Sequence, residues 1–215
     1  MKYCFWAVLF LMSLALSAQD ALPFKKEVEE IVKRNDSLWN SAQKTIVFTG
    51  SSSIRFWKDL QERFPEQQVL NAGFGGSQTI DLWHHLNDLV LRYQPTKVFI
   101  YEGDNDIFSK KSPKAILGTT QKIIEKLLMD NPNREVVLIS AKPSLSRWKL
   151  RGKYKRLNKK LAKYAVANAK VAFVDVWNPM LNRRKVRDDI FVEDGLHMNE
   201  KGYEIWYNTI KDFMD

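Results

Sequence analysis

Five short hydrophobic runs are spaced along the chain, and each leads towards a stretch in which hydrophobic residues recur at helical spacing. The runs are rich in β-branched and aromatic residues and cover 45–49, 67–73, 97–103, 135–141 and 171–177. Short, nearly continuous apolar runs are typical of parallel strands that are buried on both faces. Because parallel strands need long connections, the alternation predicts a parallel sheet covered by helices.

Apolar residues three and four positions apart predict the helices around these strands. They are expected over 23–40, 80–93, 113–129, 147–163 and 200–213, and after the first strand, with Ile54, Trp57, Leu60 and Phe64 on one face. The sequence therefore predicts the α/β class, a three-layer α/β/α sandwich with a flavodoxin-like five-stranded parallel sheet.

Polar and glycine-rich segments follow three of the predicted strands. They are Gly50 to Ser53 after the first strand, Asn71 to Gly73 after the second and Gly103 to Asp106 after the third. A fourth polar segment, Asp194 to His197, precedes the last helix. In parallel α/β sheets, ligands bind beyond the carboxyl ends of the strands, so we expect these segments to meet at one edge.

A serine hydroxyl needs an adjacent base to act as a nucleophile, usually a histidine oriented by a carboxylate. Of the three histidines, His84 and His85 fall in the middle of a predicted helix, whereas His197 lies three residues after Asp194. This arrangement indicates a nucleophile among Ser51 to Ser53 with His197 as its base. The alternative is that these serines, and Asp194, only cap helices, a position both residue types favour.

Acyl transfer also needs hydrogen-bond donors for the oxyanion that develops on the attacked carbonyl. The candidates are the backbone N–H of Ser52, the backbone N–H of Gly73 and the side-chain amide of Asn105. Gly73 and Asn105 are also residues that commonly occur in turns, which is the alternative interpretation for both.

The four segments, in this order, resemble those of the SGNH hydrolases, also called the GDSL esterase and lipase family. They are Gly50-Ser51-Ser52, Asn71-Ala-Gly73, Gly103-Asp-Asn105-Asp106 and Asp194-Gly-Leu-His197. The resemblance implies a serine ester hydrolase with Ser52, Asp194 and His197 as catalytic residues, and Ser52, Gly73 and Asn105 as oxyanion donors. Ser51 departs from the aspartate that is usual in the family, which bears on subfamily and substrate. Residues 142–148 also resemble a segment that borders the site in some members.

The first residues of the chain resemble an export signal. Lys2 precedes an apolar run that ends in the small residues Ala15, Ser17 and Ala18. We expect 1–18 to be a signal peptide, 19–215 to be a single hydrolase domain, and the mature protein to be periplasmic or extracellular. An uncleaved membrane anchor is the alternative. The one cysteine, Cys4, lies inside this segment, so the mature chain needs no disulfide.

The formal net charge is +9, and much of it is concentrated in 147–163. Aromatic and aliphatic residues recur between these charges at helical spacing, which indicates a helix with one packed and one solvated face. We therefore expect no nucleic-acid partner, and at most weak contact of this basic helix with anionic surfaces. The oligomeric state is left open by the sequence.

Two other enzyme classes fit parts of the pattern. The glycines of 73–76 follow a predicted strand, as in nucleotide-binding loops, but Gln78 stands where a dinucleotide fingerprint requires glycine. A metal-dependent hydrolase would use Asp104, Asp106, Asp194 and His197, but the usual two-histidine spacing is missing. We expect neither a cofactor nor a metal.

The substrate is predicted from the family resemblance together with the aromatic residues. We expect short-chain acyl esters, mainly acetyl esters of carbohydrates, with Phe74 and Trp148, and also Trp83, as candidate contacts. A lysophospholipid or an ester like platelet-activating factor is the alternative. A third hypothesis is a non-catalytic surface-binding protein that uses the basic helix 147–163.

Overall fold

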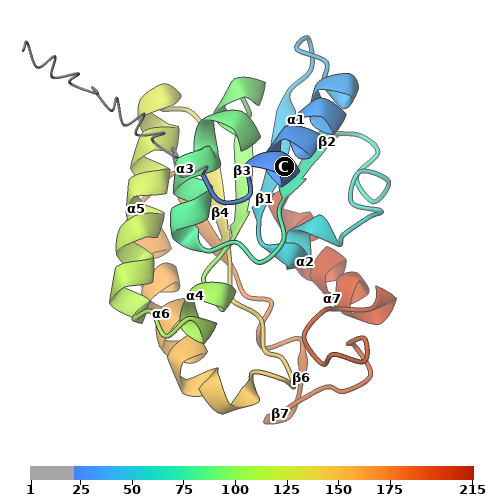
Figure 1. Ribbon diagram of the computed structural model, residues 1–215, viewed down its shortest axis with the longest axis vertical. Helices are drawn as coiled ribbons and strands as arrows, with labels where there is room; N and C mark the ends of the chain where they lie inside the picture. The colour runs from blue at the N-terminus through green and yellow to red at the C-terminus, as the bar shows by residue number, and fades with distance from the viewer. Residues whose placement is uncertain (1–21) are drawn as a thin grey trace, which may run out of the picture.

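Five parallel strands form the central sheet of the computed structural model, which describes residues 22–215 (Figure 1). They are β1 (Thr45–Gly50), β2 (Gln68–Gly73), β3 (Lys97–Tyr101), β4 (Glu135–Ile139) and β5 (Val171–Val174). The strand order is β2-β1-β3-β4-β5 and all four pairings are parallel. Strand order therefore reverses at β1, whose neighbours are β2 and β3.

Helices lie on both sides of this sheet. The longer ones are α1 (Lys25–Leu38), α3 (Thr79–Leu89), α5 (Pro113–Asp130), α6 (Arg151–Val166) and α7 (Glu200–Ile210). Two short helices, α2 (Ser52–Arg55) and α4 (Asp104–Phe108), follow β1 and β3. Single 3-10 turns occur at Leu91–Tyr93, Trp148–Leu150 and Lys211–Phe213, and β6 (Leu181–Asn182) pairs with β7 (Lys185–Val186) in a small hairpin.

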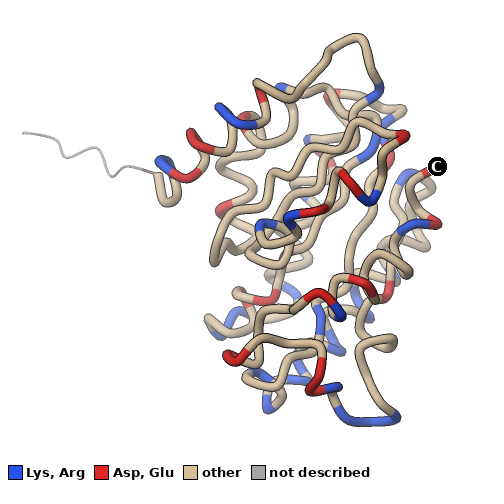
Figure 2. Tube along the Cα trace, turned by 90° about the vertical axis from the view of Figure 1, so that its right-hand side faces the viewer, with Lys and Arg blue, Asp and Glu red and all other residues tan. Residues whose placement is uncertain are grey.

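Alternate residues of each strand enter two separate hydrophobic layers, because successive side chains point to opposite faces of a sheet. Val47, Val98 and Val136 pack with residues of α1, α3, α5 and α6. Phe48 and Phe99 pack on the other face with Trp57 and Trp206, the latter from α7. The strands carry few charged residues (Figure 2). The predicted α/β three-layer sandwich with its flavodoxin-like parallel sheet is confirmed.

The long helix predicted after β1 is wrong, since α2 is a single turn followed by irregular turns. Asn71 of β2 ends it by donating its side-chain amide to the carbonyl oxygens of Ile54 at 2.7 Å and Trp57 at 3.2 Å. Those carbonyls would otherwise accept bonds from later residues of a helix. Leu60 and Phe64 are buried all the same, because turns also direct every third or fourth side chain towards the sheet.

Smaller differences occur at other boundaries. The segment after β3, expected as a polar loop, forms α4, and β5 ends at Val174, before the predicted end. The expected signal segment, residues 1–18, lies outside the described residues. Within 22–215, no helix is long and apolar enough to cross a membrane.

Gly50 connects the end of β1 to α2 and has no room for a side chain. Its φ is +127°, and an added Cβ would lie 2.0 Å from the carbonyl oxygen of Tyr101 on the neighbouring strand.

We predict that Gly50→Ala lowers the free energy of unfolding by about 3 kcal/mol or more, measured by urea denaturation. Its matched control is Gly118→Ala in α5, where an added Cβ meets nothing within 4 Å. That change should stabilise the protein by about 0.5–1 kcal/mol. Equal unfolding midpoints for both variants would contradict the prediction.

Candidate active site

Ser52 lies at the point where strand order reverses. Gly50, two residues before it, pairs in register with Gly73 of β2 and with Tyr101 of β3. The segments that follow these three strands therefore emerge side by side at one edge of the sheet. This is the edge at which parallel α/β sheets form binding sites.

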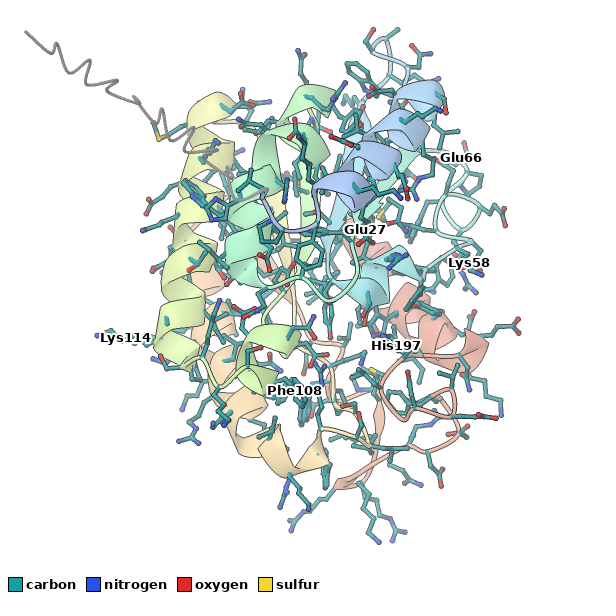
Figure 3. The ribbon with its side chains drawn as sticks, in the orientation of Figure 1. Glu27, Lys58, Glu66, Phe108, Lys114 and His197 are labelled. Carbon is teal, nitrogen blue, oxygen red and sulfur yellow. The ribbon has the colours of Figure 1, made fainter. Side chains whose placement is uncertain are left out.

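Ser52, His197 and Asp194 form a continuous hydrogen-bonded chain. Ser52 Oγ lies 3.0 Å from His197 Nε2, and His197 Nδ1 lies 2.5 Å from Asp194 Oδ2. His197 comes from the loop that precedes α7 and lies just beyond α2 in Figure 3. The ring of Phe56 packs edge-on against the imidazole, with 5.0 Å between ring centroids. The structure thus brings these three residues together.

Hydrogen bonds hold Asp194 in its ionised form. Burial acts to raise its pKa, but hydrogen bonds from the backbone N–H groups of Leu196 and His197, and from the His197 ring, outweigh this and lower the pKa to about 2. Both N–H groups donate to Oδ1, at 2.8 and 2.9 Å, which leaves Oδ2 for the imidazole. The carboxylate thus orients the ring with its Nε2 towards Ser52.

Asn105, from α4, lies beside the same serine segment. Its Nδ2 donates to Ser51 Oγ at 2.8 Å and to the carbonyl oxygen of Ser77 at 2.9 Å. Its Oδ1 accepts a hydrogen bond from Arg147 Nη1 at 3.0 Å. The amide nitrogen therefore faces the serine segment, as the oxyanion role requires.

Ser51, the residue that departs from the family pattern, has its hydroxyl between two of the predicted oxyanion donors. Ser51 Oγ accepts from the backbone N–H of Ser52 at 2.7 Å and from Asn105 Nδ2 at 2.8 Å. The side chain is buried, and it supplies both donors with an acceptor when no substrate is bound.

The expectation that Gly73 provides an oxyanion donor is wrong. Gly73 is buried, and its N–H donates to Asn71 Oδ1 at 3.0 Å. A Cβ at this position would lie 2.3 Å from the backbone nitrogen of Arg55. The glycine is needed for close packing of β2 against α2. The Asn-x-Gly pattern held a signal of this, because asparagine side chains often bond the backbone N–H two residues on.

Gly76 is a further candidate for the backbone donor, and the sequence analysis did not single it out. It is exposed at φ +74°, and none of the hydrogen bonds found within 22–215 involves its N–H. The following residue, Ser77, contacts Asn105 through its carbonyl group. Glu27 of α1 fixes the turn from the other side by accepting from the N–H of Gly75 at 2.9 Å. The sequence alone could not identify this glycine, because both its positive φ and its proximity to Asn105 depend on how the turn after β2 folds.

The expected substrate contact Phe74 is wrong, because its side chain is fully buried against Phe24 and His85. Trp148 is half-buried and stacks on Trp177 with 6.0 Å between ring centroids, so it packs with the hydrophobic core. Trp83 also packs against the core, and Lys126 lies over its ring. The contacts found for these three aromatic residues are therefore packing contacts.

The residues of the two alternative enzyme classes are engaged elsewhere. Asp106 accepts from the backbone N–H and the hydroxyl of Thr79 at 3.0 and 2.8 Å, and Asp104 is paired with Arg147. In the described part of the chain, no three His, Cys, Asp or Glu residues are grouped to hold a metal. The N–H of Gly75 already faces the carboxylate of Glu27, which disfavours phosphate at the glycine turn.

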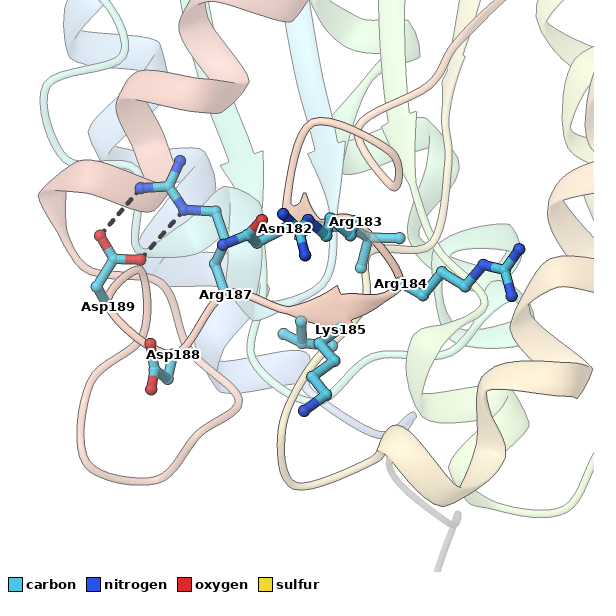
Figure 4. A pocket seen from close by; sticks show the side chains of 9 residues that line it. Asn182, Arg183, Arg184, Lys185, Arg187, Asp188 and Asp189 are labelled. Carbon is cyan, nitrogen blue, oxygen red and sulfur yellow. Dashed lines mark hydrogen bonds and ion pairs between the residues drawn. The ribbon is translucent and has the colours of Figure 1, made fainter.

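A separate hollow of about 1100 Å³ lies at the β6–β7 hairpin, lined by 181–189 (Figure 4). Arg187 pairs there with Asp189 at 2.9 Å, while Arg183 and Arg184 extend into solvent. None of the predicted site residues lines this hollow. It is a feature of the hairpin and not of the site around Ser52.

Comparison with known proteins gives a family and several similar structures. The sequence profile of the GDSL-like Lipase/Acylhydrolase family matches residues 36–205. No curated protein matches the chain.

Three solved structures illustrate the likeness. A Streptococcus pneumonia protein, provisionally described as a platelet activating factor, has a TM-score of 0.77 at 25% identity, over 88% of this chain and 94% of its own. A GDSL-like lipase from Bacteroides thetaiotaomicron has a TM-score of 0.73 at 22% identity, over 86% of this chain and 96% of its own. A carbohydrate esterase family 3 protein from Talaromyces cellulolyticus has a TM-score of 0.66 at 16% identity, over 80% of this chain and 96% of its own.

The profile match includes the segments that carry Ser52, Asn105 and His197. It agrees with the resemblance carried by the four sequence segments and with the parallel sheet on which they meet. The chain belongs to the GDSL-like lipase/acylhydrolase family and is a carboxylic ester hydrolase.

Proposed function

We propose that this ester hydrolase uses Ser52 as nucleophile, His197 as general base and acid, and Asp194 to orient His197. The observation that carries the proposal is the unbroken chain from Ser52 Oγ to His197 Nε2 at 3.0 Å and from His197 Nδ1 to Asp194 Oδ2 at 2.5 Å. A hydroxyl within hydrogen-bond reach of an imidazole that a carboxylate orients is the arrangement that activates serine.

In the proposed mechanism, Ser52 Oγ attacks the ester carbonyl carbon while His197 Nε2 takes the hydroxyl proton. The resulting oxyanion accepts hydrogen bonds from the N–H of Ser52, from Asn105 Nδ2 and from the N–H of Gly76. Collapse of the tetrahedral intermediate expels the alcohol, which takes the proton from His197. Water, activated by the same imidazole, then attacks the acyl-serine and releases the acid.

For the substrate, we propose acetyl or similarly short acyl esters of carbohydrates. A hollow of about 850 Å³ begins at Phe56, which packs on His197, and continues past Tyr203. Met198 completes the apolar part of its lining, and the polar part consists of Lys58, Asp59, Arg63, Asn199, Glu200 and Lys201. Aromatic rings combined with polar side chains suit a polar, ring-shaped alcohol.

Export of the protein fits this substrate class and is proposed with it. Residues 1–18 would be removed as a signal peptide, and the mature enzyme would act in the periplasm or outside the cell, where polysaccharides are present. An N-terminal sequence of the mature protein that begins near residue 18 would support this. An intact Met1 would contradict it.

A lysophospholipid or another lipid ester is the second candidate substrate. Three exposed apolar side chains lie around the site, namely Phe56, Phe108 and Leu145. Leu145 borders the turn of Gly195, and Phe108 stacks on Arg147, which contacts Asn105. Such side chains suit contact with an acyl chain or a lipid surface.

Ser52→Ala tests the nucleophile directly. With chromogenic acetyl esters, we expect kcat to fall by about ten-thousandfold or more, because the attacking oxygen is lost. The matched control Ser109→Ala changes an exposed serine at the end of α4 and should keep wild-type activity. Full activity of Ser52→Ala would contradict the proposed role of Ser52. If the wild type and Ser52→Ala both fail to cleave every ester, the non-catalytic binding hypothesis is favoured instead.

Acyl chain length separates the two substrate classes. We predict that the wild type releases acetate from acetylated glycans and short chromogenic esters at least about tenfold faster, by kcat/KM, than octanoate from the matching esters. The physical reason is that charged and amide side chains lie among the aromatic ones around the hollow beside His197. A preference for octanoate, with rapid hydrolysis of lysophospholipids, would favour the lipid substrate.

On the acid side of its pH profile, kcat/KM should fall with the uptake of a single proton. Because the pKa of Asp194 is lowered to about 2, its carboxylate stays ionised between about pH 5 and 8, where histidine normally titrates. The serine proton can pass only to a neutral imidazole. We expect kcat/KM to fall about tenfold per pH unit on the acid side. A flat profile over this range, or a slope of two protons, would contradict the assignment.

A further inference from the structure

We propose that a buried charged cluster of Lys142, Asp104 and Arg147 positions both sides of the catalytic site. Arg147 fixes the amide of Asn105, and Lys142 fixes the backbone next to His197, while Asp104 holds both cations. The inference rests on the proposed roles of Asn105 and His197, and it adds three positioning residues that the Ser-His-Asp mechanism does not use.

Lys142 lies in the segment after β4 with its side chain only 1% exposed. Its ammonium donates to the carbonyl oxygen of Leu196 at 2.6 Å and lies 3.8 Å from Asp104 Oδ2. A buried ammonium needs such partners, because its transfer from water is costly. Leu196 directly precedes His197, so this bond ties the loop of the catalytic base to the sheet.

Arg147 acts on the opposite side of the site. Its Nη1 donates to Asp104 Oδ1 at 2.6 Å and to Asn105 Oδ1 at 3.0 Å. With the amide oxygen bound to a cation, the amide nitrogen of Asn105 must face Ser51. A flipped amide would place its NH₂ group against the guanidinium and its oxygen against the carbonyl of Ser77. The positive charge also polarises the amide, which strengthens its N–H donors.

Asp104 is the common anchor of the cluster. It is 5% exposed and accepts hydrogen bonds from Tyr101 at 3.0 Å and Tyr154 at 2.5 Å, besides its bond with Arg147. Tyr101 belongs to β3 and Tyr154 to α6. The carboxylate is thus fixed by two rigid elements, and its hydrogen-bonding capacity is satisfied.

The cluster spans the two groups that must approach a carbonyl from different directions, the amide of Asn105 and the imidazole of His197. A displacement of about 1 Å in such a site can cost about a hundredfold in rate. Loss of either cation should therefore lower kcat and leave KM nearly unchanged, because neither side chain needs to contact the substrate.

Single substitutions test the two cations. We expect Arg147→Met and Lys142→Met each to lower kcat for a neutral acetyl ester by about 10- to 100-fold, with KM within about twofold of wild type. Arg147→Lys keeps the charge but loses the planar guanidinium, so its kcat should lie between the values of Arg147→Met and the wild type. The matched controls Arg184→Met and Lys114→Met, at exposed positions, should keep wild-type kinetics.

A double-mutant cycle separates positioning from general stability. If Arg147 acts through Asn105, Arg147→Met should cost less than about twofold in kcat in the Asn105→Ala background, whereas Lys142→Met should keep its full cost there. Additive losses for Arg147 and Asn105, or an unchanged kcat in either single Met variant, would overturn the proposal. A raised KM with wild-type kcat would also overturn it, in favour of substrate contact.

Two further measurements keep the test decisive. If Arg147→Met does not fold, the same cycle is run with Arg147→Lys, and wild-type kcat in that variant together with additivity would overturn the proposal. Ser52→Ala is assayed alongside. Activity retained by Ser52→Ala contradicts the proposed function itself, whereas inactive Ser52→Ala with fully active cation variants contradicts only the positioning roles.

Discussion

The hydrogen bond between Ser52 Oγ and His197 Nε2 joins residues that lie 145 positions apart in the chain. Its 3.0 Å length depends on the sheet: β1 must end at Gly50, next to β3, and the loop before α7 must return to the same edge. The absence of a side chain at Gly50 makes this possible, because an added Cβ would overlap the backbone of β3. The proposed chemistry therefore rests on close backbone packing at the strand reversal.

Around that bond, the site is held largely by polar contacts. Asp194 accepts two backbone N–H groups on one oxygen and the imidazole on the other, and these bonds lower its pKa. On the other side, Asp104 accepts hydrogen bonds from two tyrosine hydroxyls and forms ion pairs with two cations. Buried charges are tolerated when every member has partners, and such networks define one geometry more sharply than apolar packing does.

The two corrected site residues, Gly73 and Phe74, are each engaged by other parts of the protein. Gly73 was expected to present its N–H, but the side chain of Asn71, two positions earlier, already accepts that bond. Phe74 was expected to face the ligand, but the strand end directs it into the layer beneath α1 and α3. Asn71 also ended the helix expected after β1. The Gly73 bond is local, whereas contacts between distant segments decided the burial of Phe74 and the end of the helix after β1.

The sequence by itself determined the five strands and most of the helices between them, because apolar periodicity is a local property. Residue chemistry pointed to Asp194, His197 and one of Ser51 to Ser53, and the resemblance to the SGNH hydrolases singled out Ser52. The sequence did not determine which backbone N–H faces the oxyanion, how far a helix runs before another strand's side chain ends it, or what Lys142 and Arg147 contact. Those features depend on distances between segments far apart in the chain. Only the tertiary structure fixes these distances, since strand order and packing decide which groups meet.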